Sequence, residues 1–255
     1  MNTALFRHGR ACPDHPRLQQ CHVVFKTWML ATRASMTNWN HVVFMRSGLR
    51  PIGLSRNDDS YELQGRGALM RIIRAADCKI MRWKNGGGTT TEIAVSPEGA
   101  SLSDFDWRIS MAHVGQDGPF SSFPGIDRTL SVLTGNGIRL AFGDGETALL
   151  DRATAPFFFA ADRAVDGVLV DGAIDDLNVM SRRSHWQHRV ERLSSADSLA
   201  VNDGLLVLVA RKGDWQVNGA ALPVGDSAVL DAPGSVELTV GGDQAELYAV
   251  WLMAS

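Results

Sequence analysis

The chain has 255 residues, of which 45% are hydrophobic and 21% are charged, and its formal net charge is −3. This composition provides enough apolar side chains for one or two folded domains and excludes a disordered or collagen-like chain. The small negative charge argues against a nucleic-acid partner, because proteins that bind the phosphate backbone carry an excess of Lys and Arg. No apolar run approaches the roughly 20 residues of a membrane span and no signal-peptide pattern is present, so we expect no membrane partner.

Cysteine usage points to a reducing compartment. Cys12, Cys21 and Cys78 are odd in number and form no Cys-X-X-Cys pair. Such a set predicts neither a disulfide framework nor a zinc knuckle. We therefore expect a cytoplasmic location.

The first 69 residues differ from the rest of the chain. Residues 1–69 carry nine Lys and Arg against four acidic residues, a net +5, whereas the remainder carries sixteen against twenty-four, a net −8. The segment shows no sustained helix or strand periodicity. RHGRACPDHPRL at 7–18 and KTWMLATRASMTN at 26–38 resemble translated palindromic repeats that lie between bacterial genes, which implies an over-extended reading frame with Met70 as the true start. We expect 1–69 to be spurious or disordered; the alternative is a basic arm that contacts nucleic acid or anionic lipid.

The rest of the chain has the pattern of an all-β protein. Short apolar or alternating runs are separated by Gly, Asp and Pro, with Asn-Gly turns at 136–137 and 218–219 and Asp-Gly turns at 144–145 and 166–167 between them. Only residues 194–200 are expected to be helical, as a link between two halves. The expected strands are 131–133, 137–142, 147–150, 157–159 and 168–171 in the first half, and 205–210, 215–217, 227–230, 236–240 and 246–253 in the second.

An internal repeat indicates that the two halves are related. GETALLD at 145–151 matches GDSAVLD at 225–231, an offset of 80 residues with four of seven positions identical. An apolar run precedes each copy, and Pro156 or Pro233 follows it. The same three features in the same order favour a duplication, which predicts two small β-barrels in tandem.

The densest polar cluster is RWKNGGGTTTE at 82–92. It is not the pattern of a phosphate-binding P-loop, because Lys84 precedes the glycines and the residues that follow favour a strand. One interpretation is a glycine-rich turn into a strand. The other is a turn that places Lys84, Asn85 and Glu92 at the mouth of a pocket.

A second cluster is FDWRIS at 105–110, where alternation places Trp107 and Ile109 on one face of a strand and Arg108 and Ser110 on the other. An inward Arg108 would need a carboxylate partner, supplied by the protein or by a ligand. An outward Arg108 would be solvated. The alternation does not distinguish the two.

Two further clusters complete the set. DGPFSSFPGIDR at 117–128 contains two Gly/Pro turns that deliver Asp127 and Arg128 to the start of a strand. DDLNVM at 175–180 places Asn178 on a polar strand face, where its side chain offers both a donor and an acceptor.

Together, WKNGGGTTTE, FDWRIS, DGPFSSFPGIDR and DLNVM resemble the HutD/Ves family, from about residue 70 to residue 183. The resemblance implies an all-β bicupin, two tandem cupin-like jelly-roll barrels of the RmlC type, which agrees with the internal repeat. It places a first barrel with a ligand pocket at 70–190 and a second, degenerate barrel at 191–255.

The family is linked to histidine-utilisation operons and is thought to bind a small acidic metabolite as a regulator. Lys84, Arg108 and Arg128 would then donate charge-assisted hydrogen bonds to a carboxylate, without all three having to face one cavity. Carried over position by position, the resemblance implies the ligand-binding residues Lys84, Asn85, Glu92, Arg108, Asp127, Arg128 and Asn178.

The sequence predicts neither a metal nor another cofactor. Metal-binding cupins use a His-X-His pair, a Glu and a later His, but only His113, His185 and His188 follow residue 69, and no His-X-His occurs. His185 and His188 are expected on a surface loop. The neutral imidazole or thiolate ligands of a transition-metal site are therefore missing.

Three functions remain open. The favoured one is a non-catalytic binding protein for a small carboxylate of the urocanate or N-formylglutamate class, with a regulatory role in histidine utilisation. The alternative is a metal-independent, epimerase-like cupin enzyme with Glu92 or Asp127 as base and Lys84 as acid. In a third, structural or partner-binding role, Lys84 and Arg108 would pair with Glu92 and Asp127. Both a monomer and a homodimer are compatible with two complete barrels.

Overall fold

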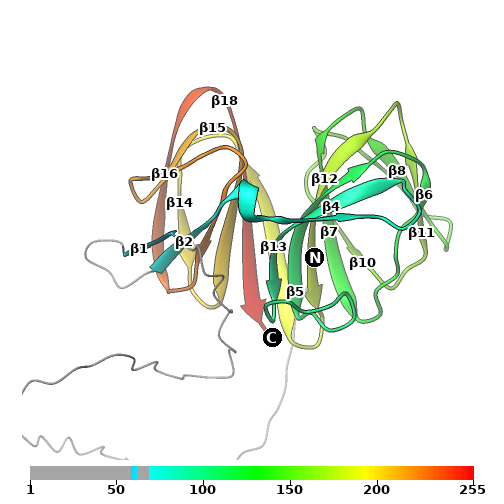
Figure 1. Cartoon of the computed structure of the whole chain (residues 1–255), viewed down its shortest axis with the longest axis horizontal. Coiled ribbons are helices and arrows are strands. Elements are labelled where there is room, and N and C mark those ends of the chain that lie inside the picture. Colours follow the sequence, from blue (N-terminus) through cyan, green and yellow to red (C-terminus); the bar gives the residue numbers. More distant parts are fainter. Residues whose placement is uncertain (1–58, 63–68) are drawn as a thin grey trace, which may run out of the picture. The chain divides into compact units, whose positions relative to one another are not determined.

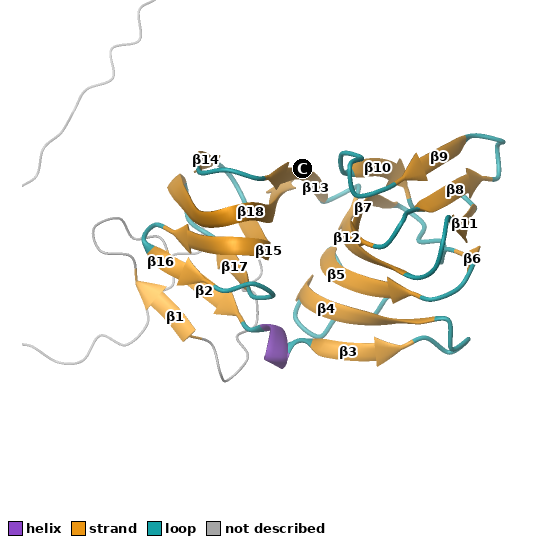
Figure 2. Cartoon of the chain, turned by 90° about the horizontal axis from the view of Figure 1, so that it is seen from above, coloured by secondary structure: helices purple, strands orange, loops and turns teal. Residues whose placement is uncertain are grey.

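In the computed structural model, which describes residues 59–62 and 69–255, the alternating runs form antiparallel strands joined in three sheets (Figures 1 and 2). The one helical element among the described residues is the 3-10 turn η1 (Ala75–Asp77), which connects β2 to β3. The expected all-β class is therefore confirmed. None of the described helical segments has the length and apolar character needed to cross a membrane.

The largest sheet has the order β1-β2-β17-β15-β18-β13, with β14 added to β18 and β16 added to β15. Its long strands curl around a core of their own that contains Met70, Trp215 and Trp251. We call this sheet the C-terminal sheet. Its strands are β1 (Asp59–Glu62), β2 (Leu69–Ile73), β13 (Trp186–Leu193), β14 (Asp197–Val201), β15 (Leu205–Val217), β16 (Ala220–Leu222), β17 (Ser227–Leu230) and β18 (Gly234–Ala254).

The other two sheets form the first barrel. A six-stranded sheet, in the order β10-β7-β12-β5-β4-β3, faces a four-stranded sheet in the order β6-β11-β8-β9 across an apolar core that includes Leu130, Leu140 and Phe142. The strands are β3 (Lys79–Arg82), β4 (Gly88–Ser96), β5 (Trp107–Val114), β6 (Gly118–Pro119), β7 (Ile126–Thr134), β8 (Ile138–Phe142), β9 (Thr147–Leu150), β10 (Phe157–Ala160), β11 (Val165–Leu169) and β12 (Ile174–Arg182).

The central strands of the six-stranded sheet are buried on both faces, whereas its edge strands β3 and β10 are partly exposed. Its outer face carries Trp107 and Ile109, which pack in one apolar cluster with Val207 and Val250 of the C-terminal sheet. The inner face points into the first barrel. Polar residues on that inner face are therefore shielded from water by sheets on both sides, which raises the free energy of leaving them unpaired.

The internal repeat corresponds to equivalent local structure. Gly145 and Gly225 both have left-handed backbones, with φ of 91° and 92°. Each precedes a four-residue antiparallel strand, β9 or β17. β9 is an edge strand and exposes Leu149, whereas β17 lies between β2 and β15 and is buried throughout. The same sequence pattern thus forms an edge strand in the first barrel and a central strand in the C-terminal sheet.

Two features differ from the sequence interpretation. The expected helical link at 194–200 is wrong: residues 197–201 form β14, because Leu199 and Val201 alternate into the apolar core. The Asp-Gly pair at 166–167 is not a turn but lies within β11, where Gly167 packs against Phe120.

Strands at both ends of the expected first domain belong to the C-terminal sheet. β2 pairs with β17, and β13, which contains the expected boundary at residue 190, pairs with β18. The expectation for residues 1–69 falls outside the described residues, apart from β1 and residue 69.

Candidate functional site

Polar side chains gather on the inner face of the six-stranded sheet. Directly paired residues of an antiparallel sheet share a face, so strand register shows which side chains project together. Leu130, Val132 and Ala112 belong to the apolar core of the first barrel, which identifies the inner face. The inner-face rows are Arg128–Met180–Arg108, Leu130–Asn178–Ser110–Glu92 and Val132–Asp176–Ala112.

Arg108 finds its partner within the protein. It points into the barrel and is only 6% exposed. Its Nε donates to Oε2 of Glu92 at 2.8 Å, and its Nη1 donates to Ser110 Oγ at 3.3 Å. The inward alternative for Arg108 is therefore correct, and its charge is balanced by a carboxylate on the next strand.

Arg128 is buried without such a partner. It is 5% exposed, and its one hydrogen bond to the described residues runs from Nη2 to the thioether of Met180 at 3.7 Å. Its Nε has no hydrogen-bond partner. The guanidinium carbon lies 5.5, 5.3 and 5.8 Å from the ring centres of Phe120, Phe123 and Phe159. These rings stabilise the cation by cation–π attraction but leave its N–H donors unsatisfied.

Burial also affects the charge state of Arg128. It lowers the pKa of the guanidinium to about 10, against the attraction of Asp176, and the neighbouring Arg108 contributes to the lowering. Arg128 is therefore still a cation at neutral pH. A buried cation whose donors lack oxygen acceptors is costly, and the oxygens of an anion would satisfy it.

Asp176 completes the inner-face cluster, although the sequence interpretation did not include it. It is 1% exposed and accepts a hydrogen bond from Nδ2 of Asn178 at 2.5 Å. Burial raises the pKa of its carboxyl to about 7, a rise that Arg128 opposes. The signal was available, because Asp176 lies two residues before Asn178 and therefore on the same strand face.

The structure places Lys84 and Asn85 elsewhere. Both are exposed in the turn between β3 and β4, where Oδ1 of Asn85 accepts a hydrogen bond from the backbone N–H of Gly87 at 3.1 Å. The following Gly88 pairs with Val114, at the opposite end of β5 from Arg108. Six residues of strand correspond to about 20 Å. The glycine-rich turn and the buried arginines are therefore at different ends of the sheet.

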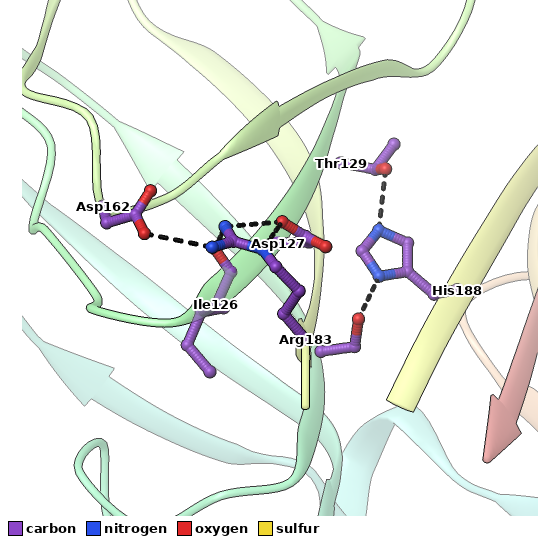
Figure 3. Close-up of polar contacts among 7 residues, drawn as sticks. Ile126, Asp127, Thr129, Asp162, Arg183 and His188 are labelled. Carbon is purple, nitrogen blue, oxygen red and sulfur yellow. Dashed lines mark hydrogen bonds and ion pairs between the residues drawn. The ribbon is translucent and has the colours of Figure 1, made fainter. Parts of the chain in front are cut away.

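Asp127 is also separated from the inner-face cluster. Its Oδ1 accepts a hydrogen bond at 2.8 Å from Nε of Arg183, which in turn contacts Asp162 at 3.2 Å (Figure 3). Alternation along β7 directs Asp127 to the face opposite Arg128. Of the seven residues expected to bind a ligand, the structure brings together Glu92, Arg108, Arg128 and Asn178.

A second polar cluster joins the two barrels. His188 lies on β13 rather than on a surface loop, and the expectation of a loop is wrong for this residue. Its Nε2 is 2.8 Å from Thr129 Oγ1 and its Nδ1 is 2.7 Å from Ser181 Oγ, both on the outer face of the six-stranded sheet (Figure 3). Burial lowers the pKa of His188 to about 4. The imidazole is therefore neutral and uses both nitrogens in hydrogen bonds.

The inner-face donor set does not fit a metal ion. Its carboxylates are Glu92, which is bonded to Arg108, and Asp176, which is bonded to Asn178. Within residues 59–62 and 69–255, no group of three or more His, Cys, Asp and Glu is arranged to hold a metal. Two guanidinium groups in the same space would also repel a cation.

Comparison with known proteins places the chain among relatives over most of its length. The HutD family model matches residues 75–248. The uncharacterised 21.2 kDa protein in the hutC 3' region of Pseudomonas putida is 32% identical over 155 residues, which cover 61% of this chain and 80% of that protein. Protein Ves of Citrobacter koseri is 34% identical over 147 residues, which cover 57% and 75%.

Solved structures agree. PA5104 of Pseudomonas aeruginosa PAO1, a conserved protein of unknown function, superimposes with a TM-score of 0.66 at 34% identity, over 72% of this chain and 98% of that one. HutD of Pseudomonas fluorescens SBW25 (formate condition) gives 0.66 at 28% identity, over 73% and 99%. YhhW of Escherichia coli, at 8% identity and a TM-score of 0.54 over 71% and 97%, shares the fold alone. The fold is thus the expected cupin-like bicupin.

Proposed function

This chain belongs to the HutD family, and we propose that it binds a small carboxylate metabolite of histidine utilisation inside its first barrel. The ligand class is that of urocanate or N-formylglutamate. In this proposal the complex has a regulatory role and catalyses no reaction, and its location is the cytoplasm.

One observation carries the proposal: the buried cation of Arg128 has no oxygen acceptor among the described residues. A guanidinium presents its N–H groups as a planar fork that matches the two oxygens of a carboxylate. Arg108 is not equivalent, because Glu92 already occupies its Nε. A ligand carboxylate would therefore pair with Arg128, while Arg108 and Glu92 form the adjacent wall.

The side chains around Arg128 favour an organic anion over a phosphate. Phe120, Phe123 and Phe159 surround the guanidinium, and together they offer apolar surface to the carbon skeleton of a ligand. Asn178 supplies an amide on the same face of the sheet, near enough to Asp176 to bond it. The Arg128 guanidinium, surrounded by these three rings, fits one carboxylate group attached to a flat or short carbon chain.

The relatives support the metabolic assignment. The Pseudomonas putida relative is described by its place in the hutC 3' region, and the Pseudomonas fluorescens HutD structure by a formate condition. Formate is the smallest carboxylate. We carry the histidine-utilisation context to this chain as part of the proposal.

The competing enzyme hypothesis loses support from the geometry. Lys84 was its acid and Glu92 or Asp127 its base, but Lys84 lies in the exposed β3–β4 turn and Asp127 is bonded to Arg183. Glu92 remains inside the barrel as the partner of Arg108. No acid–base pair of that composition is assembled, so binding without turnover is the better explanation.

A thermal-shift titration of the full chain tests the proposal. Formate, urocanate and N-formylglutamate are the ligands, and a sugar nucleotide is the control. A ligand at 100 times its Kd adds about 2.7 kcal/mol of stability, which corresponds to a rise of roughly 5–10 °C. A shift with an acidic ligand, lost in Arg128→Leu, supports the proposal. Silence of all three carboxylates, or a shift with the sugar nucleotide alone, contradicts it.

A further inference from the structure

The inside of the first barrel holds two pairs of opposite charges that differ in geometry. Arg108 and Glu92 are in direct contact at 2.8 Å. Arg128 and Asp176 lie on the same inner face of adjacent strands, β7 and β12, and both are at most 5% exposed. Yet no ion pair within 4 Å joins Arg128 to any carboxylate of residues 59–62 and 69–255. The second pair is thus charge-balanced without being in contact.

We propose, on the basis of the proposed function, that Asp176 takes up a proton when a carboxylate binds Arg128, so that the barrel binds the anion and the proton together. The anion replaces Asp176 as the negative charge that balances Arg128. Asp176 then shares the shielded inner face with the bound anion, and its own negative charge, no longer balanced by Arg128, is costly there. A proton on its carboxyl removes that charge and leaves the barrel interior neutral.

Among residues 59–62 and 69–255, no cation other than Arg128 balances the charge of Asp176. On β7 its paired residue is Val132, and Arg128 lies four residues further along that strand on the same face, where its charge still acts on Asp176. On β5 it meets the backbone N–H of Ala112, while Arg108 on that strand is held by Glu92 of β4. On its own strand, Asn178 donates to it; Asp175 is a like charge that is itself bonded to His113 and Thr134. The opposing four-stranded sheet contributes apolar side chains, which are Ile138, Leu140, Phe142, Leu150 and Val165.

The direction of the pH dependence follows from these contacts. The pKa of Asp176 is already raised to about 7 by burial while Arg128 opposes the rise. When a ligand anion offsets Arg128, the pKa rises further, so binding takes up a proton wherever Asp176 was ionised in the free protein. The apparent affinity for a carboxylate should therefore fall by up to about tenfold per pH unit above pH 7 and level off below it.

Isothermal titration calorimetry with formate on the full chain measures this coupling. Formate is the probe because it has no second ionisable group. At pH 8, titrations in buffers of different ionisation enthalpy should show an uptake that approaches one proton per formate bound, and at pH 6 the uptake should be close to zero. This measurement requires no variant. Binding of formate without proton uptake at pH 8 would overturn the inference and leave the proposed function intact.

Matched variants assign the proton to Asp176. Asp176→Asn should keep formate binding but lose both the proton uptake and the change in affinity between pH 6 and pH 8. Asp175→Asn, the neighbouring carboxylate on the outer face, should retain both. Unchanged uptake in Asp176→Asn would assign the proton to another group and overturn the inference. Absence of formate binding by the folded wild-type chain at any pH would remove the proposed function and the inference with it.

Discussion

Arg108 and Arg128 flank the same residue of β12, because each is directly paired with Met180, the first from β5 and the second from β7. Both arginines are buried, yet Glu92 contacts Arg108 at 2.8 Å, and no carboxylate of the described chain contacts Arg128. Two guanidiniums in one row of one sheet therefore have different electrostatic environments. Substitutions at the two positions should have opposite consequences for stability.

Replacement of Arg128 should separate binding from folding. In Arg128→Leu, the unsatisfied buried cation disappears and Asp176 becomes neutral by taking up a proton. We expect the ligand-free chain to be as stable as the wild type or more stable by up to about 2 kcal/mol, with the stabilisation by carboxylates abolished. Urea unfolding without urocanate measures the stability of the ligand-free chain, and unfolding with urocanate measures the stabilisation by the ligand. The control Arg139→Leu alters an exposed arginine on β8 and should keep the ligand effect. Marked destabilisation of Arg128→Leu would indicate a structural role instead.

Replacement of Glu92 should have the opposite effect. Glu92→Gln leaves the Arg108 guanidinium buried beside a neutral amide, and we expect the free energy of unfolding to fall by about 3 kcal/mol. The double variant Glu92→Gln with Arg108→Met removes both charges and should recover most of that loss. Chemical denaturation of the two single variants and the double variant gives the coupling energy. Additive single effects would show that the ion pair contributes nothing.

Alternation and register explain how much of the site could be predicted. Period-two alternation correctly grouped Arg108 with Ser110 on one strand face, and the family motifs named Arg128 and Asn178 as candidate ligand-binding residues, which the structure places on that same face of the sheet. Alternation gives no information about where a turn lies along a sheet. Lys84 and Asn85 are close to Glu92 in sequence, but the β3–β4 turn places them at the far end of β5. Residues that are close along a hairpin are therefore not close to the same part of the sheet.

Residues whose role depends on a partner distant in sequence were missed. His188 contacts Thr129, which lies 59 residues away in the sequence. The residues around His188 have the composition of a loop, but they form β13 because they pair with β18. β14 was not predicted, because the alternation of Leu199 and Val201 is too short to outweigh the helix propensity of the surrounding residues. Turn chemistry located β8, β9, β10 and β17, but it divided each of the long strands β15 and β18 into two. The partners of the strands depended on tertiary pairing that one sequence does not encode locally.

Gly167 leaves room for the ring of Phe120, one of the three Phe rings around the Arg128 guanidinium. A Cβ at this position would lie 2.6 Å from Cε2 of Phe120 and 2.8 Å from Cδ1 of Ile138. We expect Gly167→Ala to displace the Phe120 ring, to lower the free energy of unfolding by about 1–3 kcal/mol and to weaken carboxylate binding. Gly118→Ala on the paired strand β6 meets nothing within 4 Å and should change neither quantity. Thermal unfolding and a formate titration of both variants test this, and equal behaviour of the two would contradict it.

His188 should make the stability of the chain depend on pH. Burial lowers its pKa to about 4 from an ordinary value of 6.5, so below pH 6.5 the unfolded chain binds a proton that the folded chain excludes. Its contribution is complete above pH 6.5 and is lost progressively down to about pH 4, by about 3 kcal/mol in all. His188→Gln keeps a donor and an acceptor for Thr129 and Ser181 and should flatten the dependence measured by urea unfolding between pH 7 and pH 4.5. His185→Gln, at an exposed histidine, should follow the wild type, and an unaltered slope in His188→Gln would contradict the assignment.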